Sequence, residues 1–404
     1  MIKYTSLNKE ESMSYVGTVV RGIKAPIIKR GDNLVDIVFD SIVSASENEG
    51  FKIENKDVVC ITEAIVARAQ NNYANVNQIA KDIKNKFDGE TVGLILPILS
   101  RNRFSMLLKG ISMGCKKLVI QLSYPGDEVG NKLVSIDELD KYGINPYSDS
   151  FTETQFRKYF PNTVHTFTGV DYINFYKEIA GNNTEVVLSN NPRFILEYTD
   201  QVLVANIHER FRTKKILVEA GVRKVYTLDE VLSQSVDNSG YHPTYGVLGS
   251  NIATEDSVKL FPRDSQYLVD EIQKKFMDKY NKTVEVMIYG DGAFKDPVGG
   301  IWELADPVVS PFFTKGLVGT PNEIKLKYMA DTKIKDLSGE AAQEAMKKII
   351  LEKKNNLVGV DDSLGTTPRR LTDLLGSLAD LTSGSGDKGT PIVFIKGYFD
   401  NYAS

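Results

Sequence analysis

The chain has 404 residues, of which 42% are hydrophobic and 25% charged, a composition that predicts a soluble globular protein of roughly two to three domains. Its 49 Lys and Arg against 53 Asp and Glu give a formal charge of −4, which argues against a general polyanion-binding surface and predicts no nucleic acid partner. Two cysteines, Cys60 and Cys115, are too few for a disulfide scaffold or a Cys-rich metal cluster. The polar N-terminus and the lack of any stretch near the ~18–20 apolar residues of a membrane span predict a cytoplasmic protein without membrane contact.

The N-terminal region, residues 1–88, reads as strand, helix, strand. A short β-prone run covers residues 16–20, and Asp32 is a suitable N-cap for a helix whose apolar stripe includes Leu34, Val38 and Ile42. The nearly continuous apolar run DVVCIT at 57–62 predicts a strand buried on both faces. EAIVARAQ follows directly, and such strand ends commonly bind ligands.

Residues 89–240 repeat a β-α-β pattern. Strands are expected in TVGLILPI, KKLVIQL, VLVAN and VRKVYTL, with helices between them. This alternation predicts a parallel sheet covered by helices, inserted between the two ends of the chain. Within it, residues 124–165 are rich in Asp, Gly, Pro, Tyr and Ser and are expected to be irregular.

The C-terminal region, residues 241–404, holds three Gly-rich stretches, YGVLGSN at 245–251, YGDGAFKDPVGG at 289–300 and TSGSGDKG at 382–389. Strands are expected in VEVMI and PIVFIKG. The charged segment GEAAQEAMKKIILEKKNN predicts a solvated helix. Thr367 and Pro368 form a suitable N-cap and first position for a helix with Leu371, Leu374, Leu375 and Leu378 in its apolar stripe.

Histidines and nucleophile motifs give little support for common hydrolases. None of the three histidines has metal-ligand spacing. His208 follows a predicted strand, where it could bind an anion or a substrate, although a structural or solvent-facing role is the favoured interpretation. Cys60 lies in a buried-strand pattern, and the chain has neither a G-x-S-x-G elbow nor a G-x-x-x-x-G-K-[ST] phosphate loop.

Gly384, Gly386 and Gly389 spell G-x-G-x-x-G, but they follow a helix and precede a strand. This is the reverse of the dinucleotide-binding order, so no Rossmann fingerprint is inferred. The glycines would let backbone N–H groups approach an anion closely, or they form a tight turn between helix and strand.

Two charged groups near the Gly-rich stretches are further candidates. Asp291, with Asp296, follows a predicted strand and could hold Mg²⁺ or Mn²⁺, or could shape the turn. Arg369 and Arg370 lie in the first turn of the helix expected to begin at Thr367 and Pro368, where the helix dipole disfavours cations. A bound anion would explain them, and so would solvation near Asp361 and Asp362.

Taken together, five segments in order resemble the coenzyme F420-0:γ-glutamyl ligase family. GIKAPIIKRGDNL resembles its "G-x-P-x-I-x-x-G-D-D-L", and ITEAIVARAQ its "T-S-K-I-V-S-K-A-E-G". YGVLGSN resembles "G-I-D-x-S-N", and VEVMIYGDGAFKDPVGG resembles an acidic strand end with a "T-D-T/S-x-G-R" core. LADLTSGSGDKGTPIVFIKGY resembles "L-V-M-G-x-x-x-G-x-P-x-V-x-V-R-G". These matches cover about half of the chain, at its two ends.

The resemblance implies a ligase-like α/β core in which region 89–240 is inserted. It implies a homodimeric enzyme that uses GTP (or ATP) and Mg²⁺ or Mn²⁺ to add L-glutamate to a carboxylate acceptor through an acyl phosphate. Position by position, it places metal at Asp291. The nucleotide residues that it implies are Pro26, Ile27, Ile28, Glu63, Ala64, Arg68, Asn251, Gly384, Ser385, Gly386 and Asp387.

The departures from the family pattern bear on metal and substrate. Leu248 stands where the family has Asp, and Glu63-Ala64 where it has Ser-Lys, while Arg68 replaces the family's second lysine. Glu63 could supply the missing metal carboxylate. The acceptor is open, with an F420 precursor, folate or an unrelated acid as alternatives. Two other interpretations remain, a non-catalytic nucleotide or metabolite sensor with this fold and an unrelated phosphate-handling transferase.

Overall fold

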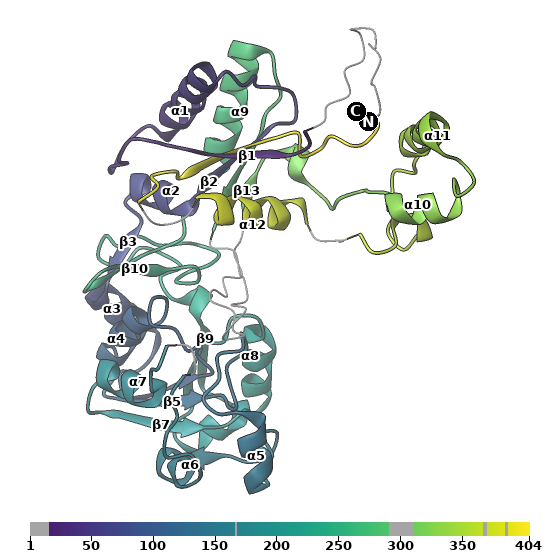
Figure 1. The fold of residues 1–404 in the computed structure, drawn as a ribbon. Helices are drawn as coiled ribbons and strands as arrows, with labels where there is room; N and C mark the ends of the chain where they lie inside the picture. The colour runs from purple at the N-terminus through teal and green to yellow at the C-terminus, as the bar shows by residue number, and fades with distance from the viewer. Residues whose placement is uncertain (1–15, 166–167, 291–309, 367–369, 384–386) are drawn as a thin grey trace.

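The computed structural model describes residues 16–165, 168–290, 310–366, 370–383 and 387–404. It is an α/β fold, as expected. Figure 1 shows a core formed by both ends of the chain, an α/β unit formed by its middle, and a pair of helices set apart on the C-terminal side. Asp291, Asp296, Arg369 and residues 384–386 lie outside the described ranges.

The core sheet has the strand order β1-β14-β2-β12-β13. β2 runs parallel to β12 and antiparallel to β14, so this N-terminal strand lies between two strands from the C-terminal region of the chain. Its strands are β1 (Val19–Ile23), β2 (Val58–Thr62), β12 (Glu285–Tyr289), β13 (Phe312–Phe313) and β14 (Ile392–Lys396).

Helices cover the core sheet on both faces, which explains the uninterrupted apolar run of β2. Val59 and Ile61 pack with α1 (Leu34–Glu49) and α9 (Gln266–Tyr280), whereas Val58 and Cys60 pack with α12 (Leu371–Ser383). A strand buried on both faces gains from apolar side chains at every position. The buried strand predicted at 57–62 is therefore confirmed, as is the apolar face of α12, where Leu371 and Leu375 are buried.

Two predicted boundaries at the N-terminus are shifted. The first strand is β1 at Val19–Ile23 and not 16–20, because it pairs with β14 from Val19 onward. The N-cap of α1 is Asn33, whose side chain accepts the N–H groups of Val35 and Asp36. Asp32 instead accepts the backbone N–H of Lys29 at 2.6 Å, so it closes the preceding turn.

The middle unit contains a second sheet with the order β6-β7-β5-β4-β8-β9, in which every pairing is parallel except that of β6 with β7. The strand order reverses between β4 and β8, which leaves a topological switch point there. Its strands are β4 (Thr91–Ile95), β5 (Lys117–Leu122), β6 (Phe151–Thr152), β7 (Thr184–Leu188), β8 (Gln201–Val204) and β9 (Lys224–Thr227). Its helices are α3 (Val76–Lys86), α4 (Ser105–Met113), α5 (Ile136–Tyr142), α6 (Glu153–Tyr159), α7 (Tyr172–Ala180) and α8 (Arg210–Glu219).

The prediction that residues 124–165 are irregular is wrong, since α5, β6 and α6 lie there. Each short helix begins at a capping box, Ser135 with Glu138 and Thr152 with Gln155. Such boxes satisfy two N–H groups that the helix itself leaves free. A cluster of aromatic rings also holds the segment together, with Tyr124 5.6 Å from Phe156 between ring centroids. The elements are too short for periodicity to reveal them.

A small sheet, β10-β11-β3, links the core to the middle unit. It places Lys259 of β11 opposite Tyr73 of β3, close to the helix α2 that follows β2. The bounds are α2 (Glu63–Gln70), β3 (Tyr73–Asn75), β10 (Asn251–Thr254) and β11 (Ser257–Lys259).

The predicted charged helix is α11 (Gly339–Leu351), which packs with α10 (Leu326–Thr332) around Met329, Met346 and Ile350. Most of its other side chains are exposed or half-buried, as expected for a solvated helix. Across the ranges that the structure describes, no helix is both long enough and apolar enough to span a membrane.

Candidate functional site

One cavity of about 420 Å³, here called the central cavity, lies where β2 ends and α2 begins. Seven residues proposed from the sequence for a nucleotide line it, namely Pro26, Ile27, Ile28, Glu63, Ala64, Arg68 and Asn251. Asp380 and Ser383 from the last turn of α12 complete one wall, and residues 389–391 another. Segments separated by up to 366 positions in the chain therefore share one cavity.

Backbone hydrogen bonds hold these segments in place. The N–H of Thr62, at the end of β2, donates to the carbonyl of Pro391 at 3.0 Å, and that of Ala25 donates to Gly389 at 3.3 Å. Gly389 is the last residue of the Gly-rich stretch 382–389, and Pro391 follows it closely. Ser383, just before residues 384–386, is buried and lines the cavity. Asp387, just after them, is exposed.

Within the central cavity, Glu63 forms an ion pair with Lys259, which reaches the cavity from β11. The side chains are 5% and 11% exposed, so both charges are largely removed from water. Lys259 contacts Oε1, whereas Oε2 of Glu63 is buried and has no hydrogen-bond partner among the described residues. A buried carboxylate oxygen without a donor is costly, so this atom is a candidate ligand position.

A second hollow of about 680 Å³, the basic groove, adjoins the central cavity and shares five lining residues with it, Ala64, Ile65, Arg68, Asn251 and Lys259. Lys29, Arg30, Arg68 and Lys259 line this groove, and no carboxylate stands among its lining residues. Lys259 is paired with Glu63, and the other three cations, Lys29, Arg30 and Arg68, create a positive potential in the groove of a chain whose net charge is negative. The groove is suited to phosphates or to several carboxylates.

The described residues provide part of a site for Mg²⁺ or Mn²⁺. Hard divalent cations prefer oxygen ligands, and the central cavity offers Oε2 of Glu63 and the amide of Asn251. Such a set fits a cation that takes its remaining ligands from water and substrate phosphates. No group of three or more His, Cys, Asp or Glu side chains suited to a metal occurs in the part of the chain that the structure describes, and Asp291 lies outside it.

Leu248 shows why one family ligand position cannot serve as such here. Its side chain is only 3% exposed, and it belongs to the apolar core of the middle unit together with Phe104 and Leu107. Apolar side chains therefore surround this position, and Leu248 does not line the central cavity.

The other proposed anion residues do not line the cavity. Arg370 is exposed just before the first turn of α12, at the opposite end of that helix from Ser383. His208 is exposed beyond the end of β8, and its backbone N–H donates to Glu128 at 2.9 Å. The structure thus separates both residues from the group around Glu63.

The switch point of the middle sheet is closed by acidic side chains of the chain itself. Asp127 accepts the N–H of Leu99, in the loop after β4, at 2.8 Å, and Glu128 accepts the N–H groups of Ile207 and His208, before α8. Two adjacent carboxylates therefore accept hydrogen bonds from backbone N–H groups at the edge of the sheet where a nucleotide-binding α/β protein binds phosphates. This geometry disfavours a nucleotide at the switch point of the middle sheet.

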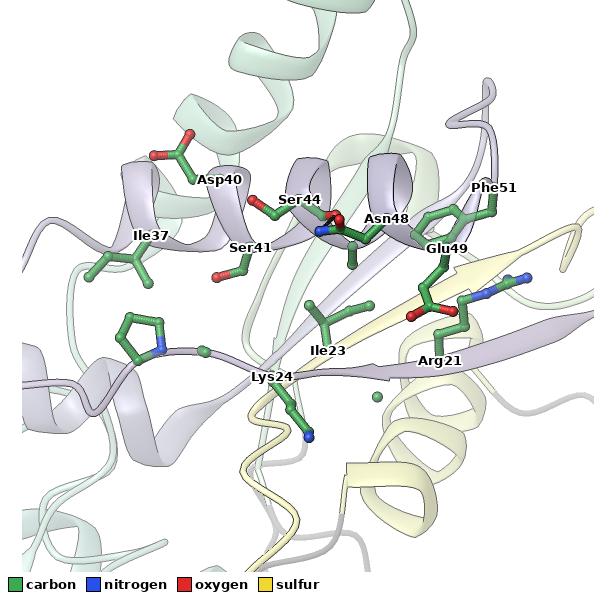
Figure 2. A pocket seen from close by; sticks show the side chains of 14 residues that line it. Arg21, Ile23, Lys24, Ile37, Asp40, Ser41, Ser44, Asn48, Glu49 and Phe51 are labelled. Carbon is green, nitrogen blue, oxygen red and sulfur yellow. Dashed lines mark hydrogen bonds between the residues drawn. The ribbon is translucent and has the colours of Figure 1, made fainter.

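A third hollow of about 970 Å³ lies between β1 and α1 and meets the central cavity at Ala25 and Pro26. Figure 2 shows Ser41 of α1 pointing toward the strand and Lys24 pointing away from the helix, and Ser44 and Asn48 of α1 also line this hollow. The Arg21 guanidinium lies 4.7 Å from the centroid of the Phe51 ring. The lining of this third hollow mixes polar and apolar groups, which suits a ring with polar edges.

Sequence reasoning missed Lys259, Asp380 and Ser383. Asp380 and Ser383 are followed by the glycines of 384–389, which is a signal that could have drawn attention to them. Lys259 has no such signal, because it ends a strand of three residues and becomes significant only through a partner 196 positions away.

Comparison with known families gives a clear result. The sequence model of the F420-0:Gamma-glutamyl ligase family matches residues 22–397, nearly the whole chain. A search of curated proteins gives no match. The family match spans both the core and the middle unit, including the regions that the five sequence segments leave unexplained.

Proposed function

Because the chain belongs to the F420-0:γ-glutamyl ligase family, we propose that it is a ligase that joins L-glutamate to a carboxylate acceptor at the expense of a nucleoside triphosphate. The acceptor is a small acid, and GTP is the nucleotide that the family resemblance suggests, with ATP as the alternative. A divalent cation, Mg²⁺ or Mn²⁺, and a homodimeric assembly are parts of the same proposal.

A single observation supports this proposal most strongly. The segments that resemble the family's nucleotide motifs, 26–28, 63–68 and Asn251, meet around the central cavity although they come from distant parts of the chain. Chance matches would have no reason to converge. The adjoining basic groove adds the positive charge that a triphosphate and an acidic acceptor require.

The proposed reaction has two steps. The acceptor carboxylate attacks the γ-phosphorus, the bond to the β–γ bridging oxygen breaks, and the nucleoside diphosphate leaves. The amine of glutamate then attacks the acyl carbon, the amide bond forms, inorganic phosphate leaves, and the amine loses its protons. When bound, the divalent cation would supply charge neutralisation at the phosphates.

The side chains have distinct proposed roles in these steps. Arg68 and Lys259 neutralise the phosphate oxygens, because both line the cavity and the groove. Glu63 and Asn251 provide oxygen ligands for the cation. Among the described residues, Asp380 is the other carboxylate that lines the central cavity, and we assign it to accept the proton of the attacking amine.

Glutamate-dependent phosphate release tests the activity. The purified full-length protein is incubated with GTP or ATP, Mn²⁺ and an acceptor drawn from a panel of F420 precursors, folates and simple acids. Release that requires both glutamate and acceptor supports the ligase, and Asp380→Asn should reduce kcat by about 10²-fold with little change in nucleotide affinity. Nucleotide binding without release under any acceptor would instead favour a sensor.

Binding and assembly are checked separately. GTP should raise the melting temperature only when Mn²⁺ is present, since the cation and the phosphates share one site. Arg370→Gln is the matched control, because Arg370 is exposed and lies away from the cavity. Light scattering on the same sample gives the oligomeric state, and a monomer would remove the homodimer from the proposal.

A further inference from the structure

The Glu63–Lys259 pair combines three features that seldom occur together in a structural ion pair. Both charges are nearly buried, both side chains line a cavity, and one carboxylate oxygen has no partner in the described structure. We infer that the pair is a latch that is exchanged on binding, with the ammonium of Lys259 passing to a phosphate or carboxylate of the ligand and the carboxylate of Glu63 passing to a divalent cation. This inference rests on the proposed function and specifies how that site is held before its ligands arrive.

Stability alone gives a weak reason for such a pair. Removing two charges from water costs more than a buried pair commonly returns, unless additional hydrogen bonds satisfy the remaining oxygens and protons. Here Oε2 of Glu63 lacks such a bond among the described residues, so the pair is incompletely satisfied. Incomplete satisfaction at the wall of a cavity is expected where ligands provide the missing partners.

The surroundings of the pair favour exchange over simple addition. Lys259 also lines the basic groove, where Lys29, Arg30 and Arg68 have no ion pair with any described residue. An anion that binds in the groove must compete with Glu63 for Lys259. A cation that binds Glu63 must displace the Lys259 ammonium. An anion alone would therefore leave the buried charge of Glu63 unpaired, and a cation alone would leave that of Lys259 unpaired.

When both ligands bind, each released residue gains a new partner of opposite charge. The buried charge stays balanced because a cation and an anion together replace one ion pair. Cation and anion binding should accordingly be positively coupled, and thermodynamic linkage requires that each raises the affinity of the other by the same factor. A bridging contact between metal and phosphate would also couple them, so the test must measure each ligand alone.

The test uses full-length protein with inorganic phosphate alone and with Mn²⁺ alone, followed by calorimetry and by the electron paramagnetic resonance signal of free Mn²⁺. In metal-free buffer, Glu63→Gln should bind phosphate severalfold more tightly than the wild type, because Lys259 is no longer held. In phosphate-free buffer, Lys259→Gln should bind Mn²⁺ severalfold more tightly, because Glu63 is free. Lys81→Gln, which removes the exposed ion pair with Asp237, is the matched control and should change neither affinity.

A structural ion pair gives the opposite pattern, since loss of either residue would leave both affinities unchanged or weaker, and that result would overturn the inference. The wild type offers a second readout if a variant fails to fold. Mn²⁺ should speed reductive methylation of Lys259, measured by mass spectrometry, and phosphate should slow it; a rate insensitive to Mn²⁺ also contradicts the latch. Neither ligand reacts in these experiments, so the outcome is independent of whether phosphate release from GTP is found.

Discussion

The hydroxyl of Tyr289, at the end of β12, donates a 2.7 Å hydrogen bond to Oγ of Ser383, the last residue of α12. Both residues are buried. β12 is parallel to β2, with Tyr289 in register with Thr62, so the bond lies directly behind the wall of the central cavity. It fixes the helix end from which the 384–389 stretch departs to the strand end that carries Thr62 and Glu63.

We expect Tyr289→Phe to lower the free energy of unfolding by about 1 kcal/mol, the net worth of one buried hydrogen bond, and to weaken GTP binding as the end of α12 loosens. Urea unfolding and calorimetry measure the two effects. Tyr147→Phe is the control, because Tyr147 is 90% exposed. An unchanged nucleotide affinity would show that Ser383 does not depend on this bond for its position.

Arg68→Gln should weaken binding of Mn²⁺–GTP by about tenfold and reduce its salt dependence. Hydrogen bonds to charged groups contribute about 1.5–3 kcal/mol, and Arg68 lines both the central cavity and the basic groove. Arg370→Gln should leave the affinity unchanged, although the sequence suggests Arg370 as an anion ligand. A larger loss in the Arg370 variant would reverse that assignment. Calorimetry at two salt concentrations decides.

His242 predicts a specific acid sensitivity of the loop that leads to Asn251. The side chain is buried, and its Nδ1 accepts the N–H groups of Thr244 at 3.2 Å and Tyr245 at 3.0 Å. Burial lowers the pKa of His242 to about 4, so the folded state keeps the ring neutral over a range in which the unfolded chain already binds a proton. Stability from this residue is therefore complete above pH 6.5 and is lost as the pH falls toward 4.

Between pH 6.5 and pH 4, the contribution of His242 to the free energy of unfolding falls by about 3 kcal/mol. Urea unfolding of the wild type and of His242→Gln at pH 7 and pH 5 isolates this contribution, because acidic groups shared by both proteins cancel. The variant should lose less stability between the two pH values. Equal losses would mean that His242 is as easily protonated in the folded state as in the unfolded chain.

The strands and helices of the core could be predicted from sequence because burial produces a local pattern of apolar residues along the chain. β2 is buried on both faces and reads as the run Val58–Ile61, while α12 repeats its leucines with helical spacing. Caps are equally local, yet two adjacent candidates, Asp32 and Asn33, differ only in which N–H groups they reach in three dimensions. That choice could not be made from the sequence.

The candidate site was only partly accessible from the sequence. Resemblance gave Glu63, Arg68 and Asn251, which lie around one cavity, but it also gave Leu248 as a doubtful ligand position without indicating that it is buried. Lys259 could not be found, because a lysine at the end of a short strand is ordinary until its partner Glu63 is located. Ion pairs between distant segments depend on the tertiary fold and leave no periodic pattern.

Asp127 should matter for the stability of the middle unit but not for nucleotide binding. Its buried carboxylate accepts the N–H groups of Leu99, Val129 and Asn131, and burial raises its pKa despite these donors. In Asp127→Asn an amide NH₂ would face N–H donors, which should lower the free energy of unfolding by about 2–3 kcal/mol. Asp140→Asn, at an exposed position, is the control. A loss of GTP affinity in folded Asp127→Asn protein would place a nucleotide at the switch point of the middle sheet instead.

Leu248→Asp restores the acidic residue that the family pattern has at this position, and the structure predicts that it will not create a metal ligand. The Leu248 side chain is 3% exposed within the apolar core around Phe104 and Leu107, so an aspartate there would be either a buried charge or a buried acid without a donor. We expect a loss of about 3 kcal/mol or more in the free energy of unfolding and no gain in Mn²⁺ affinity. Leu248→Ala separates the cavity contribution, about 2–4 kcal/mol, from that of the charge. A Leu248→Asp protein that is as stable as the wild type and binds Mn²⁺ more tightly would instead show that this position opens toward the cation.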